Sequence, residues 1–304
     1  MAHLILHPGL HKTGTTAIQK LLESHSAMLQ RSGIGYVKQS QFAPALRPLV
    51  NRLGRKLGDV DLTEVEQITD ELVQEALQGK EAVILSYEDL IGSQYLHLHK
   101  SLYPHMDSRI AMLARLAEKF DRVSVVLTIR NQAELLESML IQLVKQGIVF
   151  DPWSIADEID LESLSLAAMV RRLNEAFGAD RVTVLAAESC DGDPALNARA
   201  LVALHDEKVA QRLRFGLARK RPNPSLSEAG LKLALATRPA IDSKLEWRQF
   251  RKFLEKNYAA GPKAKRARIL KPEQRARILD RHWPETREML AAAGLSALGP
   301  RYAE

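Results

Sequence analysis

The sequence predicts an α/β fold in which a mainly parallel central sheet carries helices on both of its faces. Three short apolar runs, at residues 82–86, 123–129 and 182–185, have the continuous hydrophobic character of strands that are buried on both sides. Segments with apolar residues at helical spacing separate these runs. Alternation of strands and helices favours parallel pairing through crossover connections.

The N-terminal segment predicts a strand, a turn and a helix in that order. Residues 3–7 form a short apolar run that a Pro-Gly pair follows, which is typical of a strand that ends in a turn. A helix is expected to begin near Thr15, with an apolar face formed by Ile18, Leu21 and Leu22. Residues 33–37 predict a second strand.

Helical periodicity recurs through the remaining chain. Apolar residues in 64–78 recur every three or four positions, and Gly79 fits the C-terminal end of that helix. Further helices are predicted within 109–119, 131–146 and 160–177, and from about residue 195 onward we expect mostly helices and basic loops. Because no repeat or long Gly/Ser linker interrupts the pattern, residues 1–304 are expected to form a single domain.

The composition is typical of a globular protein with a core of its own. Of the 304 residues, 46% are apolar and 26% are charged, and a chain of this length buries most of its unfolded surface. The only cysteine, Cys190, excludes an intramolecular disulfide and a four-cysteine zinc site. It lies in a Ser-Cys-Asp-Gly turn without the context of a nucleophile, so we expect an inert thiol, and because no Asp/Glu/His cluster has ligand spacing we expect no metal centre. No apolar run is long enough to span a membrane and no secretory leader precedes the first strand, so we expect a cytoplasmic protein.

Positive charge is concentrated in the C-terminal third. Residues 1–210 hold 21 Lys and Arg against 28 Asp and Glu, a balance of −7, whereas the remaining 94 residues hold 22 against 9, a balance of +13. This asymmetry indicates an anionic ligand or partner, although a solvated helical surface is equally compatible with it. Because aromatic residues make up only 5% of the chain, we expect no single-stranded nucleic acid among its partners.

The most informative segment connects the first strand to the first helix and reads Gly9-Leu10-His11-Lys12-Thr13-Gly14-Thr15-Thr16. A loop of this kind directs backbone N–H groups toward one point beside the positive end of a helix dipole, which is a binding site for an anion. Gly14 permits close approach of the backbone and Lys12 adds a positive charge. The alternative is a turn that merely connects the strand to the helix.

This loop differs from the nucleotide-hydrolase motif G-x-x-x-x-G-K-[ST]. Gly9 and Gly14 have the separation of the two glycines in that motif, but Thr15 stands where the motif has lysine. Lys12 instead precedes the second glycine by two positions, so it approaches a bound phosphate from another side. The difference argues against an ordinary ATPase.

The string HKTGTT at residues 11–16 resembles the 5′-phosphosulfate-binding loop of sulfotransferases that use 3′-phosphoadenosine 5′-phosphosulfate (PAPS). The longer string HPGLHKTGTTAIQ resembles a bacterial branch of that superfamily. The resemblance implies a P-loop-like sulfotransferase fold in which Lys12, Thr13, Gly14, Thr15 and Thr16 bind the donor. It also implies that Lys12 acts in catalysis by neutralising the departing phosphate, with no divalent metal.

A second motif of these enzymes binds the 3′-phosphate through an arginine at the end of a strand and a serine eight residues later. Here Arg130 follows the run 123–129, and Ser138 lies eight residues further on in a predicted helix. A guanidinium at this place can donate paired hydrogen bonds to a phosphate. The alternatives are a surface salt bridge for Arg130 and a solvated helix position for Ser138.

Members of the family often complete the 3′-phosphate site with a basic loop in the C-terminal third. Arg219, Lys220 and Arg221 are the candidates for that role in this chain. The family's Arg-Lys-Gly pattern is absent here, and an exposed basic loop explains these residues equally well.

A candidate general base follows the strand at 82–86. One branch of the family uses a histidine and another, which acts on sugars, uses a glutamate. Glu88 lies at the carboxyl end of a predicted parallel strand, where such folds bind ligands, and a carboxylate there can accept a proton. Asp89 is the competing candidate, with a helix cap as its structural alternative, while His97 and His99 are expected in a loop or on the surface.

Together these features predict a PAPS-dependent sulfotransferase that releases 3′,5′-ADP. The acceptor is expected to be a hydroxyl or amine of a small molecule or carbohydrate, and variable loops at 38–60, 92–108 and 146–160 are expected to contact it. Two alternatives remain: a P-loop kinase that uses ATP and magnesium, and a non-catalytic protein that binds polyanions through its basic C-terminal region. The sequence leaves the identity of the acceptor and the oligomeric state open.

Overall fold

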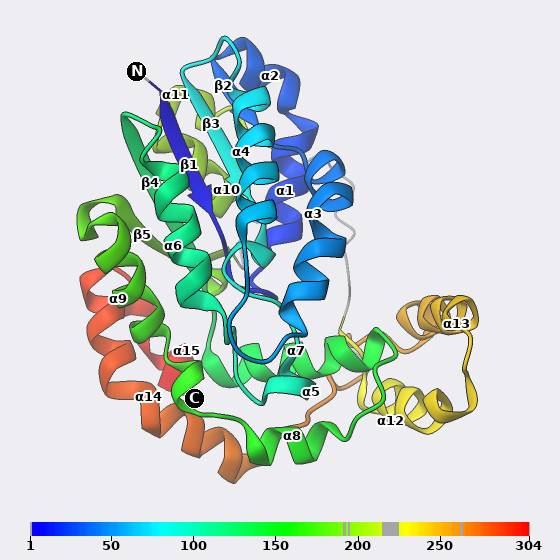
Figure 1. The fold of residues 1–304 in the computed structure, drawn as a ribbon. Helices are drawn as coiled ribbons and strands as arrows, with labels where there is room; N and C mark the ends of the chain where they lie inside the picture. The colour runs from blue at the N-terminus through cyan, green and yellow to red at the C-terminus, as the bar shows by residue number, and fades with distance from the viewer. Residues whose placement is uncertain (1, 191–192, 194, 215–224, 262–263, 304) are drawn as a thin grey trace.

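A computed structural model describes residues 2–190, 193, 195–214, 225–261 and 264–303 and shows a five-stranded parallel sheet (Figure 1). Its strand order is β2-β3-β1-β4-β5. The strands are β1 (His3–His7), β2 (Ile34–Tyr36), β3 (Ala82–Ser86), β4 (Arg122–Ile129) and β5 (Val182–Ala186). Every strand predicted from the sequence is therefore confirmed, and so is the α/β class.

Helices surround this sheet. The N-terminal half contains α1 (Thr15–Ser24), α2 (Ser26–Arg31), α3 (Gln39–Gly54), α4 (Thr63–Leu77), α5 (Leu96–His99), α6 (Met106–Ala117) and α7 (Gln132–Lys145). The C-terminal half contains α8 (Pro152–Glu158), α9 (Leu166–Phe177), α10 (Leu196–Ala203), α11 (Glu207–Ala210), α12 (Glu228–Thr237), α13 (Lys244–Asn257), α14 (Pro272–Ala292) and α15 (Gly299–Ala303). No described helix is long and apolar enough to cross a membrane.

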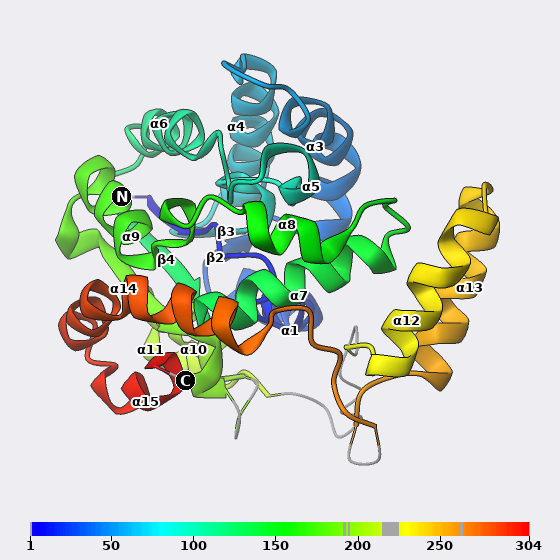
Figure 2. The same ribbon diagram turned by 90° about the horizontal axis from the view of Figure 1, so that it is seen from below.

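The two faces of the sheet bury separate sets of side chains. Successive strand residues point to opposite faces, so Leu4 and Leu6 of β1 join one core and Ile5 between them joins the other. The first core includes residues of α3, α4, α6, α7 and α9, and the second includes residues of α1, α2, α10 and α11. Figure 2 shows the corresponding layers, with the sheet between the two sets of helices.

The central position of β1 determines where a ligand can bind. β1 lies between β3 and β4, and the chain moves toward β3 and β2 on one side and toward β5 on the other. In open parallel sheets, ligands bind beyond the carboxyl ends of the strands at such a change of direction. The loops after β1, β3 and β4 all leave the sheet at this edge.

Several helical boundaries follow directly from local chemistry. The predicted helices at 64–78, 109–119 and 131–146 are confirmed as α4, α6 and α7. Gly79, just after α4, has a φ of 69°, a left-handed conformation that suits glycine at a helix end. The helix predicted over 160–177 begins only at Leu166, because the Ser165 hydroxyl accepts a hydrogen bond from Ala168 N–H and caps it.

The expectation of a loop at 38–60 is wrong, because most of that segment is α3. Proline normally opposes a helical interior, and the segment contains Pro44 and Pro48. Both prolines lie one turn apart on the exposed side, while the opposite side buries Phe42, Leu46, Leu49, Val50 and Leu53. Burial of that apolar face outweighs the missing backbone hydrogen bonds. The other two expected loops contain the shorter helices α5 and α8 and the start of α6.

The C-terminal third is helical, as predicted, over its described residues. Helices α12 and α13 project to one side of the sheet and its covering helices (Figure 1, Figure 2). Helix α14 then returns to pack against α7 and α9. The segment between α13 and α14 consequently passes close to the carboxyl ends of the strands.

A buried histidine bridges the three central strands. His7 is fully buried, with Nδ1 2.8 Å from Ser86 Oγ of β3 and Nε2 2.9 Å from Thr128 Oγ1 of β4. Burial lowers the pKa of His7 from 6.5 to about 4. The neutral ring suits this position because its two nitrogens can serve as one donor and one acceptor toward the two hydroxyls.

The pKa of His7 predicts acid sensitivity of the fold. Between pH 6.5 and 4 the unfolded chain binds a proton at His7 that the folded chain does not, so the unfolding free energy should fall by about 3 kcal/mol as the pH decreases through this range. His7→Gln removes the titrating group and should flatten the profile by that amount in urea unfolding experiments. His25→Gln serves as the control, and an unchanged pH profile in His7→Gln would contradict this role for His7.

Candidate functional site

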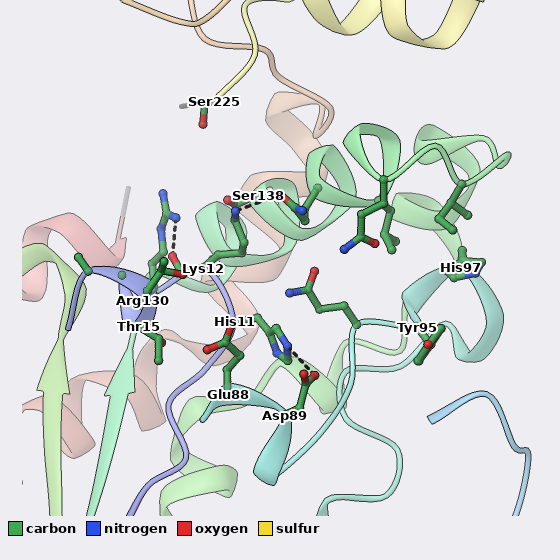
Figure 3. A pocket seen from close by; sticks show the side chains of 18 of the residues that line it. His11, Lys12, Thr15, Glu88, Asp89, Tyr95, His97, Arg130, Ser138 and Ser225 are labelled. Carbon is green, nitrogen blue, oxygen red and sulfur yellow. Dashed lines mark hydrogen bonds and ion pairs between the residues drawn. The ribbon is translucent and has the colours of Figure 1, made fainter. Parts of the chain in front are cut away.

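A cavity of about 930 Å³ opens at the carboxyl ends of the central strands. The loop after β1, the turn after β3 and helix α7 contribute to its wall (Figure 3). Helix α3 and the segment between α13 and α14 contribute as well. The structure brings together here most of the residues that the sequence singled out, namely Lys12, Gly14, Thr15, Thr16, Glu88, Arg130 and Ser138. Residues that are 126 positions apart in the sequence thus share one cavity.

Two groups of predicted residues are not part of this wall. Thr13 is buried beneath the loop, where its hydroxyl donates a hydrogen bond of 2.5 Å to the Leu10 carbonyl and shapes the turn. Arg219, Lys220 and Arg221 lie outside the described residues, so their proposed contact with a 3′-phosphate stays a prediction.

The loop after β1 presents the start of α1 to the cavity. Lys12 and Gly14 both have positive φ angles, 66° and 89°, and Gly14 is the N-cap residue of α1 without a side-chain cap. The first N–H groups of a helix have no partner within the helix itself. Because no side chain caps α1, these N–H groups are left to bind an anion at the start of the helix, where the positive end of the helix dipole also attracts it.

Lys12 lies within a group of cations. Its Nζ donates a hydrogen bond of 3.4 Å to Gln142 Oε1 of α7. Burial, together with the positive charges of Lys145, Arg130 and Arg266, lowers the pKa of Lys12 to about 8, while Glu88 opposes the shift. A bound anion would reverse this shift, because it would stabilise the charged ammonium group.

Arg130 connects this loop to β4 and α7. Its Nη1 donates a hydrogen bond of 2.9 Å to the Lys12 carbonyl, and its Nη2 lies 3.3 Å from Glu134 Oε2. Asn131 caps α7 by accepting a hydrogen bond of 3.0 Å from Glu134 N–H. These contacts fix the positions of Arg130 and Asn131 relative to Ser138, which lies two turns further along α7.

Glu134 pairs with three further arginines from the C-terminal part of the chain. Its carboxylate lies 2.6 Å from Arg268 Nη1 and 3.2 Å from Arg275 Nη1, and its Oε2 also pairs with Arg266. Burial favours the neutral acid, but the surrounding guanidinium groups prevail and lower the pKa of Glu134 to about 2. One carboxylate thus holds several positive groups beside the cavity.

Arg266 is a site residue that the sequence did not single out. It lines the cavity, and its Nη1 binds Glu134. Its Nε and Nη2 atoms are buried and have no hydrogen-bond partner among the described residues. Unpartnered buried donors are costly, so a ligand that accepts hydrogen bonds would stabilise this arrangement. The run KAKRAR at 263–268 was the available signal in the sequence, but nothing there indicated which arginine faces the site.

The candidate base Glu88 projects from the turn after β3. Its Oε2 accepts a hydrogen bond of 3.3 Å from Gln19 Nε2. The same amide nitrogen also donates a hydrogen bond of 2.9 Å to the Ser86 carbonyl. Glu88 is only half-buried, and it lines the cavity below Lys12 in Figure 3. A carboxylate in that position is accessible to a second ligand.

Asp89 has a structural partner instead. Its Oδ1 lies 3.1 Å from His11 Nε2, and Tyr103 Oη lies 2.9 Å from His11 Nδ1 and accepts a bond of 2.9 Å from His11 N–H. This network assigns the Nε2–H tautomer to His11, which donates to Asp89. Burial opposes ionisation of Asp89, but His11 prevails and holds its pKa below the ordinary value. Asp89 thus fixes His11 rather than capping a helix.

The two downstream histidines lie in the short helix α5. His99 Nε2 lies 2.8 Å from the Gly54 carbonyl and connects α5 to the end of α3, whereas His97 lines the cavity. Among the described residues, no group of three or more His, Cys, Asp and Glu is placed to hold a metal ion.

Comparisons with known proteins give a distant structural similarity. No protein-family model matches the chain, and no curated protein matches it in sequence. Among solved structures, the chain is similar to a sulfotransferase from Alicyclobacillus acidocaldarius with 13% sequence identity, a coverage of 95% of each chain and a TM-score of 0.47. Similarity at this level does not define an activity, so the chemistry of the site is inferred from its own residues.

Proposed function

We propose that residues 1–304 form one domain that transfers a sulfuryl group from PAPS to a hydroxyl or amine and releases 3′,5′-ADP. One observation supports this proposal: two adjacent sets of cationic and hydrogen-bonding groups line the same cavity, and each suits a phosphate-like anion. The first is the start of α1 with Lys12, and the second is Arg130 with Ser138 and the unpartnered donors of Arg266. A nucleotide that carries both a 5′-phosphosulfate and a 3′-phosphate matches these two sets.

Each end of the donor is assigned by charge and position. The 5′-phosphosulfate would accept hydrogen bonds from the loop at residues 12–16, as the resemblance to the sulfotransferase loop implies. The 3′-phosphate would bind Arg130, Ser138 and Arg266, so Arg266 is added to the residues expected from the sequence. A cytoplasmic location, where PAPS is made, belongs to the same proposal.

The transfer step requires one proton acceptor and one group that stabilises the departing phosphate. The acceptor oxygen or nitrogen attacks the sulfur, the bond from sulfur to the bridging phosphate oxygen breaks, and its electron pair leaves with 3′,5′-ADP. The proton of the acceptor passes to Glu88, which lines the cavity and lacks an ion-pair partner among the described residues. Lys12 neutralises the charge that develops on the departing phosphate oxygen.

An ATP-dependent kinase fits the same cavity less well. The lysine of nucleotide hydrolases follows the second glycine of the loop, whereas Lys12 precedes Gly14 by two positions. The guanidinium groups of Arg130 and Arg266 also offer a second set of donors for an anion beside the loop, which a nucleoside triphosphate without a 3′-phosphate does not require.

Arg130 and Arg266 should make the site selective for a 3′-phosphate. By calorimetric titration, the unmodified chain should bind 3′,5′-ADP much more tightly than AMP. Arg130→Gln and Arg266→Gln should each lower the affinity for 3′,5′-ADP by about 10- to 100-fold, the range expected for a lost charged hydrogen bond. The affinity for AMP should be nearly unchanged. Arg52→Gln, on the outer side of α3, is the control. Equal losses for both nucleotides would disprove the assignment.

The pKa of Lys12 predicts the pH dependence of nucleotide binding. Below pH 8 the ammonium group is charged and affinity should be constant, whereas above pH 8 binding must take up a proton, so the affinity for 3′,5′-ADP should fall by up to about tenfold for each pH unit. The ligand phosphates are already ionised in this range. Lys12→Arg should bind without this decline, and a flat profile to pH 9.5 in the unmodified chain would contradict the role of Lys12.

Glu88 should affect transfer but not nucleotide binding. With any acceptor that the unmodified chain sulfates, Glu88→Gln should lower kcat by about 100- to 10,000-fold, the usual contribution of a general base, and leave the affinity for 3′,5′-ADP unchanged. Glu81→Gln, an exposed residue just before β3, is the matched control. Normal turnover in Glu88→Gln together with inactivity of Asp89→Asn would transfer the role to Asp89.

A further inference from the structure

The half of the cavity away from the phosphate loop has its own cationic wall. Arg47, Asn51 and Arg55 line it from α3 and its C-cap, and they follow one another at intervals of four residues. Residues four apart lie on the same face of a helix, so this face of α3 is directed toward the cavity. In Figure 3, Tyr95 and His97 lie at this end, opposite Lys12 and Arg130.

These arginines have no carboxylate partner. Among the described residues neither Arg47 nor Arg55 forms an ion pair, and the Arg55 guanidinium lies over the Tyr95 ring at 5.6 Å from its centre. Arg52 of the same helix differs, because its Nη2 lies 3.2 Å from Glu64 Oε2. Arg52 does not line the cavity. Two positive charges therefore line the cavity without an ion-pair partner in the part of the chain that the structure describes.

Neighbouring polar atoms also lack partners. Gln94 Oε1 and His97 Nδ1 are buried and have no hydrogen-bond partner among the described residues, and both residues line the cavity. Burial, with the nearby charges of Arg55, His99 and Lys100, lowers the pKa of His97. Buried polar groups are normally hydrogen-bonded, so a ligand with several hydroxyl groups would complete this wall.

The size and the charge of the cavity indicate what that ligand is. Sites for a single drug-sized molecule range from about 300 to 1,000 Å³ and are mainly apolar. This cavity lies near the upper end at about 930 Å³, and its far half presents arginines and amides. The Cα atoms of Arg47 and Arg55 are about 12 Å apart along the helix axis, so an extended acidic ligand can present a separate acidic group to each arginine.

We propose that this half binds a multiply anionic, polyhydroxylated acceptor, namely an acidic oligosaccharide. The inference rests on the proposed sulfuryl transfer, since it assigns the acceptor of that reaction. Arg47 and Arg55 would pair with acidic groups on successive parts of the ligand, and Gln94 and His97 would bond its hydroxyls. The reacting hydroxyl would then lie near Glu88, which lines the same cavity close to Lys12.

A matched pair of ligands tests this inference. With 3′,5′-ADP at saturation, calorimetric titration compares trigalacturonate with its fully methyl-esterified form, which keeps the sugar backbone but lacks the charges. The acid should bind at least about tenfold more tightly than the ester, as expected for charge-assisted contacts with two guanidinium groups. Its affinity should decrease as NaCl is raised, because salt screens these contacts.

The variants then locate the effect. The double variant Arg47→Gln, Arg55→Gln should bind both trisaccharides equally and keep the unmodified affinity for 3′,5′-ADP, whereas Arg52→Gln should retain the preference for the acid. Equal affinity of the unmodified chain for the two forms, including no binding of either, would overturn the inference, and so would a preference that survives the double substitution.

Failure of the donor assignment gives a different result. If the unmodified chain does not bind 3′,5′-ADP, the proposed function is contradicted, and the trisaccharide titration without nucleotide still decides whether Arg47 and Arg55 form an anionic subsite. If 3′,5′-ADP binds and the two trisaccharides bind with equal affinity, only the proposed class of acceptor is wrong.

Discussion

Glu134 connects the two parts of the chain that enclose the cavity. Its carboxylate pairs with Arg130 at the end of β4 and with Arg266, Arg268 and Arg275, which lie more than 130 residues later. Without that carboxylate, four neighbouring guanidinium groups would repel one another in a partly buried place, where unpaired charges are costly. The pair with Arg266 also directs the remaining donors of that side chain to the cavity wall, so the architecture of the site depends on this one residue.

The charge balance around Glu134 explains why the cavity favours anions. Glu134 and Glu137, which also pairs with Arg268, supply two carboxylates for four arginines, and Lys12 adds a further cation whose pKa is lowered by burial and by its positive neighbours. Glu88 alone opposes that shift. A bound anion would therefore lower the electrostatic energy of the site. A dianionic phosphate near Arg266 and a phosphosulfate near Lys12 are the proposed partners, and the basic C-terminal third contributes through Arg266 rather than as a diffuse surface.

The sequence predicted what local chemistry determines. The strands, the start of α1 and the convergence of Lys12 with Arg130 follow from buried apolar runs and from the geometry of parallel sheets. Arg266 was not predicted because its position depends on contacts with α7 across the fold, and α3 was missed because its prolines masked an apolar face. The His11 contact that engages Asp89 is likewise a long-range contact. The roles assigned to Lys12, Glu88, Arg130 and Ser138 stay predictions.

Calorimetric titration of the full chain with 3′,5′-ADP, and separately with ATP and magnesium, tests the central claim most directly. We expect binding of 3′,5′-ADP with one site per chain and much weaker binding of ATP, because only 3′,5′-ADP supplies a phosphate to Arg130 and Arg266. Tight binding of ATP with magnesium and none of 3′,5′-ADP would contradict the account and favour a kinase.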